Sequence, residues 1–307
     1  MEIDGVFSGG GLKGLALVGA CKVFEQNGYT FKRTVGTSAG AIVAAMLAAG
    51  YTSIEMEEIM REQDFPALLD TRRTFIRLPF MKWIQLYWKM GLYQGVALEN
   101  WFSDILANKG VYTFADLPEG SLKIIVSDLT NGKLIVLPDD LGEYGLQPDF
   151  FPVARALRMS TSIPFFFEPV TLHSLAGDAV TVDGGVLSNF PLWMFNDSEN
   201  EETRPVVGMK LSHTPETKKK TTIRNGLGLY EALFSTMKDA HDEKHISKSL
   251  EKDVMFIPTE GISAVQFDLS DLQKEQLVVS GEQAASEFLT HWRRSKMPYL
   301  HKTLKII

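Results

Sequence analysis

Ser38 lies in a sequence pattern that could support nucleophilic chemistry. It is the centre of the run Gly-Thr-Ser-Ala-Gly at positions 36–40, directly after a short strand-like segment. The run predicts a strand, a sharp turn and a helix that begins at Ala39. Glycine is expected at Gly36 and Gly40, because a side chain there would collide with neighbouring backbone. Such an elbow holds the serine in a strained backbone conformation with its hydroxyl exposed, so Ser38 is a candidate nucleophile.

A glycine-rich loop precedes this elbow in the sequence. It reads Phe-Ser-Gly-Gly-Gly-Leu-Lys-Gly over positions 7–14, and its glycines are Gly9, Gly10, Gly11 and Gly14. Loops of this kind leave backbone N–H groups open to an anion. A serine nucleophile needs such donors, because its attack on a carbonyl group creates a negatively charged oxygen. The two segments together indicate an acyl-transfer enzyme.

A serine hydroxyl remains a weak nucleophile until a base removes its proton. Histidine is the usual base, but none of the six histidines of this chain lies in a glycine-flanked turn after a strand. Asp183 does, because a short apolar segment precedes it and Gly184 and Gly185 follow it. Sites in open α/β proteins gather at the carboxyl edge of the sheet. We therefore expect Asp183 at the same edge of a parallel sheet as Ser38.

Length and composition are those of a soluble globular protein. The chain has 307 residues, of which 45% are hydrophobic and 22% are charged, so it can bury a substantial core. Its formal net charge of −7 argues against general nucleic-acid binding, which needs a basic surface. The single cysteine, Cys21, allows no intrachain disulfide and is expected to be buried. Neither a signal-peptide pattern nor a membrane-spanning apolar run is seen, which predicts a cytoplasmic location.

Strand-like and helix-like segments alternate along the chain, which predicts an α/β fold with a mainly parallel sheet sandwiched by helices. Helices are expected at 13–26, 39–49, 151–159 and about 270–292. Capping boxes are expected at Thr52 with Glu55 and at Ser270 with Gln273. The expected strands are 3–8, 34–36, 122–127, 133–137, 180–182, 206–211 and 254–257, with a hairpin turn at 128–132.

No linker or repeat interrupts this pattern, so the sequence predicts a single domain over residues 1–307. The motif-bearing part extends to about residue 190, and residues 191–307 are expected to complete the fold or to add helices. The helix at 39–49 is apolar on all sides and is expected to be buried in the centre of the molecule.

Three motifs in this order make the chain resemble the patatin-like phospholipase family of lipid acyl hydrolases. They are Gly9-x-Gly11-x-x-Gly14, Gly36-x-Ser38-x-Gly40 and Asp183-Gly184-Gly185. The run from Arg158 to Pro164 is also similar to the family's pattern. The resemblance covers roughly the first two thirds of the chain, and no motif anchors the last third.

The resemblance implies a patatin-like fold and hydrolysis of fatty-acyl esters, in particular those of phospholipids or lysophospholipids. It implies that Ser38 is the nucleophile, that Asp183 is its only partner as general base, and that the loop around Gly10 and Gly11 is the oxyanion hole. No metal or organic cofactor is implied. A carboxylate that acts as the base would have to be desolvated, with raised proton affinity.

Lys13 stands where the family more often has arginine. The substitution keeps the positive charge but loses the planar fork of the guanidinium group. Two roles for Lys13 therefore remain: it binds an anion, or it stabilises the loop.

Two motifs allow other interpretations. Gly9-x-Gly11-x-x-Gly14 also fits a dinucleotide-binding fingerprint, but the acidic residue that this fingerprint expects about 20 residues later is replaced by the elbow. His241 and His245 lie on one face of a helix-like segment, as zinc ligands do, but no third ligand is evident and the neighbouring charges are typical of a solvated helix. A Ser-His-Asp hydrolase and a non-catalytic lipid-binding protein remain as alternatives to the dyad.

The stretch 71–95 reverses the charge of the chain locally. It carries five basic and no acidic residues, interleaved with six aromatic residues. Basic and aromatic side chains together suit an anionic lipid surface. The alternative is a helix packed on the core with solvated basic edges. Peripheral membrane contact through 71–95 is thus one expectation, while the headgroup preference and the oligomeric state are not determined by the sequence.

Overall fold

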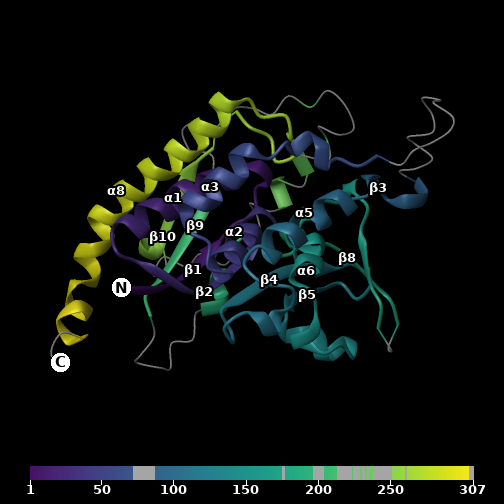
Figure 1. Ribbon diagram of the computed structural model, residues 1–307, viewed down its shortest axis with the longest axis horizontal. Coiled ribbons are helices and arrows are strands. Elements are labelled where there is room, and N and C mark those ends of the chain that lie inside the picture. Colours follow the sequence, from purple (N-terminus) through teal and green to yellow (C-terminus); the bar gives the residue numbers. More distant parts are fainter. Residues whose placement is uncertain are drawn as a thin grey trace.

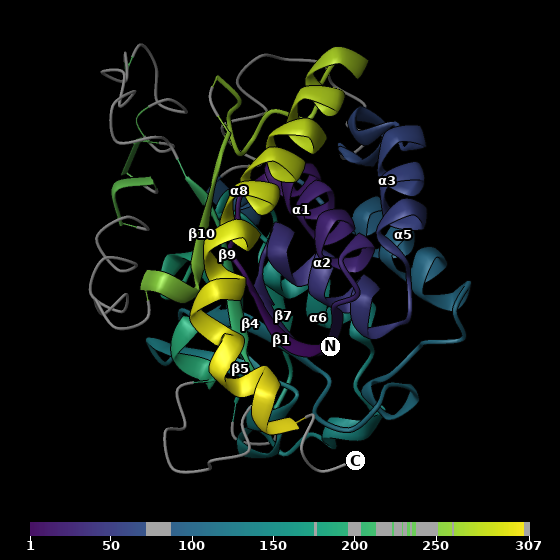
Figure 2. The ribbon, with the colours of Figure 1, turned by 90° about the vertical axis from the view of Figure 1, so that its left-hand side faces the viewer.

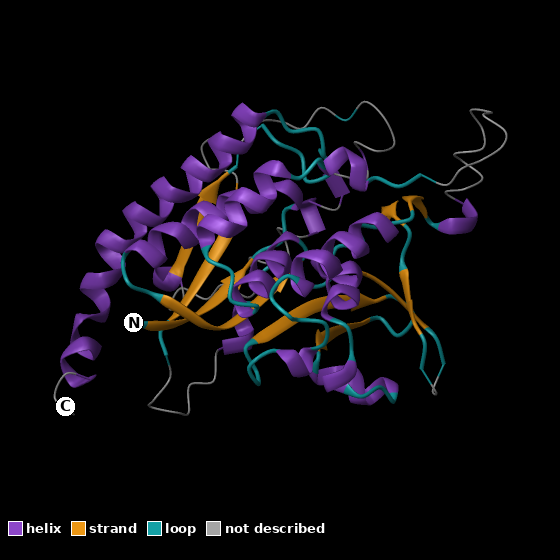
Figure 3. Ribbon diagram, in the orientation of Figure 1, coloured by secondary structure: helices purple, strands orange, loops and turns teal. Residues whose placement is uncertain are grey.

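The computed structural model describes residues 1–71, 87–174, 177–195, 204–212, 223, 229, 232–233, 235–237, 251–259 and 261–303. They form a central sheet with helices packed against it and a separate two-stranded ribbon (Figure 1, Figure 3). The expected α/β class is confirmed. Residues 72–86 of the basic aromatic stretch, together with His241 and His245, lie outside the described residues.

The central sheet has the strand order β10-β9-β1-β2-β4-β8-β7, and β5 also pairs with β4. Neighbouring strands from β10 through β4 are parallel, whereas β5 and β8 run antiparallel to β4, and β7 runs antiparallel to β8. The sheet is therefore parallel on one side of β4 and antiparallel on the other. The strands are β1 Glu2–Phe7, β2 Thr30–Thr37, β4 Leu122–Asp128, β5 Lys133–Leu137, β7 Val170–Leu172, β8 Ala179–Asp183, β9 Val206–Ser212 and β10 Val254–Pro258.

Strand β2 is longer than the sequence pattern predicted. Its second half, from Thr34, is fully buried and was expected as a strand, whereas Thr30 to Arg33 alternates between exposed and half-buried positions. This first half is mostly polar, and it forms a strand because it pairs with β1 from Glu2 opposite Thr30 onward. Backbone pairing along an existing strand outweighs the weak local propensity of these residues.

Helices cover one face of the sheet and form the larger hydrophobic cluster with it (Figure 2). The central helix α2 is buried along most of its length, as its apolar sequence predicted. Helix α3 begins with the expected capping box between Thr52 and Glu55. The α-helices among the described residues include α1 Gly14–Gln26, α2 Ala39–Ala48, α3 Ser53–Glu62, α5 Val96–Ala107, α6 Val153–Ser160 and α8 Asp271–Thr303.

Two glycines allow the last third of the chain to pack closely on the first. Helix α8 lies along α1 (Figure 1, Figure 2), and a Cβ atom at Gly19 or Gly281 would overlap the backbone of the facing helix. Glycine thus allows the two helix backbones to approach closely. Residues after 190 also supply strands β9 and β10 of the central sheet. The single domain stays a prediction, and these contacts support it.

The opposite face of the sheet carries a smaller apolar cluster. Val6, Val35 and Ile125 from three neighbouring strands meet Phe190 and Leu192, near the short helical turn η7 Leu192–Phe195. Cys21 is buried in the main core, as expected, and burial raises the pKa of its thiol. Within the described part of the chain, no helix combines the length and the apolar character that crossing a bilayer requires.

A separate ribbon of two short parallel strands lies beyond the central sheet (Figure 1). Strand β3, Gly91–Tyr93, pairs with β6, Phe165–Phe167, with Gly91 opposite Phe165 and Tyr93 opposite Phe167. A Cβ atom at Gly91 would overlap the backbone of Phe167 and Glu168, so the two strands can approach this closely only with glycine at that position. Neither strand was predicted from the sequence.

Candidate active site

The strand β2 ends at Thr37 and helix α2 begins at Ala39, so Ser38 forms the turn between them. Its backbone has φ 53° and ψ −121°, a conformation that side-chain-bearing residues rarely adopt. Strain of this kind costs about 1–3 kcal/mol and persists only where the surrounding structure enforces it. The elbow predicted from the sequence is present, and Ser38 is its strained residue. Ser38 is only 4% exposed, however, so the expectation of an exposed hydroxyl is wrong.

Gly36 and Gly40 leave the space that this turn requires. A Cβ atom at Gly36 would overlap the backbone of Gly40, and one at Gly40 would overlap the backbone of Phe7 on the neighbouring strand β1. The backbone N–H of Ser38 donates to Oγ of Ser160 at 2.9 Å. Close backbone contacts at Gly36 and Gly40 and the hydrogen bond to Ser160 therefore hold the elbow in place.

The glycine loop lies directly against Ser38. A Cβ atom at Gly9 would lie 3.2 Å from Cβ of Ser38. The N–H of Gly9 donates to the carbonyl of Asn189 at 3.1 Å, so it is already engaged within the fold. Gly10 and Gly11 begin the short helical turn η1 Gly11–Lys13, and no helical carbonyl accepts from the first N–H groups of a helix. The backbone N–H groups of Gly10 and Gly11 are therefore the candidate donors to an anion at Ser38.

The rest of the loop is shaped by contacts on both sides. Gly11 has φ 62°, and an added Cβ there would overlap the backbone of Ala264. Gly14 faces Ala39 on α2, where an added Cβ would lie 3.2 Å from the alanine Cβ. Lys13 ends η1 and is half-buried.

Asp183 is the last residue of β8 and is 1% exposed. Its N–H donates to the carbonyl of Ser162 at 2.9 Å, and its Oδ1 accepts from the N–H of Gly185 at 2.7 Å. The N–H bond fixes the backbone of Asp183, and the bond from Gly185 fixes its carboxylate at the start of the Asp-Gly-Gly turn. Gly184 packs on the elbow, because an added Cβ there would lie 3.0 Å from Cγ2 of Thr37.

Asp183 was expected at the same edge of a parallel sheet as Ser38, but the sheet is antiparallel at Asp183, so that part of the expectation is wrong. Strand β8 runs antiparallel to β4, with Asp183 opposite Val126, while Thr37 of the parallel strand β2 lies opposite Ile125 of β4. Asp183 and the elbow therefore meet across one strand, although their strands run in opposite directions. The strand direction was not visible in the sequence, because the connection from 129 to 178 contains a hairpin and the ribbon strand β6 before β8 begins.

The segment after the Asp-Gly-Gly turn joins the three motifs. The hydroxyl of Thr37 donates to the carbonyl of Ser188 at 2.9 Å, and the next residue, Asn189, accepts from Gly9. An added Cβ at Gly9 would also lie 2.6 Å from Oδ1 of Asn189. Ser188 and Asn189 are thus placed between the turn, the elbow and the glycine loop. Sequence analysis did not single them out, and their position shortly after the Asp-Gly-Gly motif was the only available indication.

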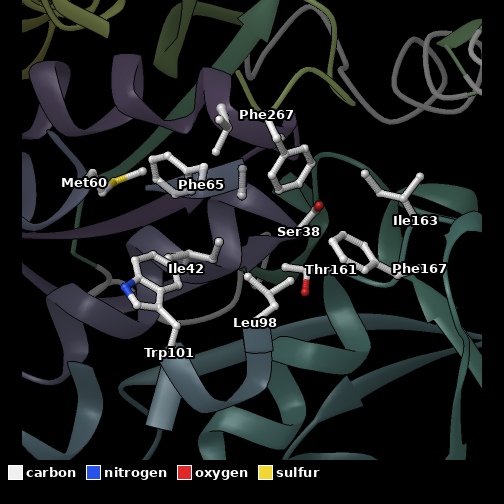
Figure 4. A pocket seen from close by; sticks show the side chains of 13 residues that line it. Ser38, Ile42, Met60, Phe65, Leu98, Trp101, Thr161, Ile163, Phe167 and Phe267 are labelled. Carbon is white, nitrogen blue, oxygen red and sulfur yellow. The ribbon is translucent and has the colours of Figure 1, made fainter. Parts of the chain in front are cut away.

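An apolar pocket opens at Ser38 (Figure 4). The serine hydroxyl lies among Phe267, Phe167 and Ile163, and the lining continues away from it toward Trp101 (Figure 4). Its walls come from the turn η1 before α1, from the start of α2, from α3 and the short turn after it, from α5, and from the segments around β6 and before α8. The lining residues are Gly11, Leu12, Ser38, Ala39, Ile42, Met60, Phe65, Leu98, Trp101, Thr161, Ile163, Phe167 and Phe267.

Aromatic residues from two elements line the pocket. Phe167 of β6 lines it, whereas Phe166 stacks on Phe267 at 5.3 Å between ring centroids. Trp101 of α5 lines the pocket as well. A helix face that lines a pocket has the same sequence pattern as one that packs on the core.

Arg158 holds the segment between α6 and β6. It is 2% exposed, and it donates to Oγ of Ser162 at 2.5 Å and to the carbonyls of Gln94 and Glu168, each at 2.7 Å. Burial lowers the pKa of its guanidinium to about 10. The side chain thus links the residues that follow β3 and β6 to Ser162, whose carbonyl accepts from the N–H of Asp183.

Other candidate groups lie elsewhere. His173 is exposed and contacts Asp178, with 2.9 Å between Nδ1 and Oδ1. Among the described residues, the lining of the pocket includes no histidine. The described part of the chain also contains no cluster of three or more residues that could hold a metal ion.

The fold and the site define an α/β protein with a strained serine at the opening of an apolar pocket. The sequence profile described as patatin-like phospholipase matches residues 5–196, and the chain belongs to that family. Membership supports a lipid hydrolase activity in general terms, and the resemblance seen in the sequence is confirmed.

Individual relatives agree with this assignment. The chain is 51% identical over 292 residues to an uncharacterised protein of Bacillus subtilis, YqhO, across 95% of this chain and 99% of that one. It is 27% identical over 234 residues to a cUMP-AMP-activated phospholipase of Escherichia coli, across 72% and 63% of the two chains. The crystal structure of VipD from Legionella pneumophila matches with a TM-score of 0.54 and 17% identity, across 94% of this chain and 67% of that one, which shows a shared fold.

Proposed function

We propose that the protein hydrolyses fatty-acyl esters through a covalent acyl-enzyme formed on Ser38, with Asp183 as the general base. The observation that carries this proposal is the strained φ of Ser38 at the opening of an apolar pocket. The fold keeps a serine in an unfavourable backbone conformation where its hydroxyl meets a cavity suited to an acyl chain. A strained serine used only for packing would not need such a cavity beside it.

The proposed first step is attack of Ser38 Oγ on the ester carbonyl. Asp183 accepts the hydroxyl proton as the new C–O bond forms, and the carbonyl oxygen becomes an anion. The N–H groups of Gly10 and Gly11 stabilise that anion, each contributing about 10²–10³ in rate. Collapse of the tetrahedral intermediate breaks the ester C–O bond, and the leaving alcohol takes the proton from Asp183.

The second step returns the free enzyme. Asp183 accepts a proton from a water molecule that attacks the acyl carbonyl on Ser38. The bond between Ser38 and the acyl group breaks, the fatty acid leaves, and the serine regains its proton. These steps use groups of the chain and water. The burial of Asp183 supports its role, because desolvation favours the protonated form of a carboxylate.

We further propose phospholipids or lysophospholipids as the substrates. The apolar lining of the pocket supports a long acyl chain, and the phospholipase from Escherichia coli among the relatives supports a phospholipid. Location in the cytoplasm and a single domain over residues 1–307 belong to the same proposal.

The test is labelling with a long-chain fluorophosphonate, followed by intact-mass spectrometry, on the wild type and on Ser38→Ala and Asp183→Asn. We expect one adduct on the wild type, none on Ser38→Ala, and a strongly reduced labelling rate for Asp183→Asn. Fatty-acid release from mixed phospholipid vesicles is measured in parallel and should be lost in both variants.

Other outcomes would favour the alternatives. A His→Ala variant as inactive as Ser38→Ala would replace the dyad with a Ser-His-Asp triad. Lipid association without any adduct or release would favour a binding protein that lacks turnover.

A further inference from the structure

Two apolar residues outside the pocket share the backbone strain of Ser38. Among the described non-glycine residues, positive φ occurs at Ser38, at Met90 with 59° and at Phe165 with 62°. The side chains of Met90 and Phe165 are 47% and 52% exposed. Strained backbone persists where a function or the surrounding packing maintains it. Here the strain places two large apolar side chains at the surface, which is an unfavourable position in water.

The two residues belong to one surface. Met90 immediately precedes Gly91 of β3, and Gly91 lies opposite Phe165 of β6. Tyr87 and Trp88, 78% and 72% exposed, continue this surface along the chain, and their rings meet edge to face at 5.4 Å. We call Tyr87, Trp88, Met90 and Phe165 the outer ribbon patch. Large exposed apolar side chains gathered on one short ribbon favour an interaction site.

The same ribbon also forms a wall of the pocket. Phe167, two residues after Phe165, lines the pocket at Ser38, as does Ile163, two residues before it. Phe166 connects the layers, because it packs on Tyr93 of β3 at 5.0 Å and stacks on Phe267 of the pocket lining. A surface that binds the outer ribbon patch therefore lies next to the wall of the pocket.

Charge indicates which surface this is. Lys89 is exposed between Trp88 and Met90, and the sequence from 71 to 95 contains no aspartate or glutamate although the whole chain has a formal net charge of −7. Tryptophan, tyrosine and lysine together favour the interface of a bilayer, where rings lie at the level of the headgroups and the ammonium group meets lipid phosphates.

We propose that the outer ribbon patch and Lys89 dock the protein on an anionic lipid surface, beside the pocket that holds Ser38. This inference rests on the proposed function and adds to it the membrane face of the enzyme. An acyl chain that leaves the bilayer would then pass along the β3–β6 ribbon into the pocket, with little exposure to water.

The test uses the double variant Met90→Asn/Phe165→Asn in the Ser38→Ala background, so that binding is measured without turnover. Asparagine is among the residues that best tolerate a positive φ, so the variant removes the apolar side chains and keeps the backbone. Co-sedimentation with vesicles of phosphatidylcholine and phosphatidylglycerol should weaken about tenfold or more relative to Ser38→Ala alone. The midpoint of thermal unfolding should stay the same or rise, because the strain is relieved.

Two controls sharpen the result. Phe150→Asn removes an apolar side chain that is 71% exposed on the short turn η5, Pro148–Phe150, and should leave vesicle binding unchanged. Lys89→Gln should weaken binding several-fold on vesicles with phosphatidylglycerol and little on pure phosphatidylcholine. Added salt should reduce that difference.

The proposal is overturned if the double variant binds vesicles as tightly as its parent. It is also overturned if the parent is a dimer in sedimentation and the double variant a monomer, since the patch would then join two copies. Failure of the proposed function is a separate result: the wild type would show neither adduct nor fatty-acid release, while the binding measurement on the Ser38→Ala proteins would still be valid.

Discussion

Ser160 holds the backbone of Ser38 through a hydroxyl group that is itself anchored. Its Oγ accepts from the Ser38 N–H at 2.9 Å and donates to the carbonyl of Ile125 on β4 at 2.7 Å. All three groups are buried. The hydroxyl thus connects the strained elbow to the strand that lies between β2 and β8, and it is one of the contacts that offset the strain at Ser38.

Ser160→Ala should leave the buried N–H of Ser38 without its acceptor. We expect the free energy of unfolding to fall by about 1–3 kcal/mol, and kcat on a soluble ester to fall more than KM rises. Urea unfolding and steady-state kinetics measure the two effects. Ser121→Ala is the matched control, because Ser121 Oγ is buried and has no hydrogen-bond partner among the described residues, so its removal should be nearly neutral. Equal effects of the two changes would contradict the role of Ser160.

Gly9→Ala should disrupt the site without unfolding the protein. The added Cβ would lie 2.6 Å from Oδ1 of Asn189 and 3.2 Å from Cβ of Ser38, so the loop must shift. Displacing the N–H donors of Gly10 and Gly11 should lower kcat for ester hydrolysis by about 10²–10³. The rate of fluorophosphonate labelling should fall as well. Gly142→Ala, where the added Cβ meets nothing within 4 Å, should keep wild-type kinetics. Normal activity of Gly9→Ala would argue against an oxyanion hole in this loop.

Arg158→Met should be strongly destabilising. It removes a buried guanidinium and leaves the carbonyls of Gln94 and Glu168 without their donor. We expect a loss of about 3 kcal/mol in the free energy of unfolding. Arg155→Met on the same helix removes a half-exposed ion pair with Glu99 and should cost less than about 1 kcal/mol. Chemical denaturation measures the loss in the free energy of unfolding for both variants. Equal losses would contradict the expected effect of burial.

Ile42→Phe should shorten the acyl chains that the enzyme accepts. Ile42 lines the pocket one turn into α2, and a larger side chain there would occupy space beyond Ser38. We expect kcat/KM to fall by about tenfold or more for long-chain esters and little for the shortest esters of a series. Ile54→Phe on α3 introduces the same change at a side chain that is 64% exposed, and its profile should match the wild type. A uniform loss across chain lengths would indicate general damage to the site.

The capping box of α3 should make a pH-dependent contribution to stability. A hydrogen bond from Lys109, followed by bonds from Thr52, lowers the pKa of Glu55 from 4.5 to about 2. A carboxylate with a lowered pKa in the folded state stabilises the protein above pH 4.5, and this contribution is lost as the pH falls toward 2. The stability difference between wild type and Glu55→Gln should therefore be present at pH 7 and should narrow below pH 4. A difference independent of pH would contradict this assignment.

Local sequence was sufficient for the elements that carry the motifs. The elbow at Ser38, the hairpin between β4 and β5 and the capping boxes of α3 and α8 were all predicted, because turn glycines, apolar periodicity and side-chain caps act over a few residues. The apolar sequence of α2 also predicted its burial correctly. Residues such as Thr30 to Arg33, by contrast, form a strand only because β1 lies beside them.

The sequence by itself determined that Ser38 is held in a strained turn and that a glycine loop and an Asp-Gly-Gly turn are available to it, because each of these depends on residues adjacent in the chain. Only the tertiary structure decided that β8 runs antiparallel to β4, that Asn189 engages Gly9, and that Trp101 and Phe167 line one pocket. These relationships depend on how distant segments pack and on which face of each element is left open. Period and composition specify that a face is apolar, and the packing of the whole chain specifies what it contacts.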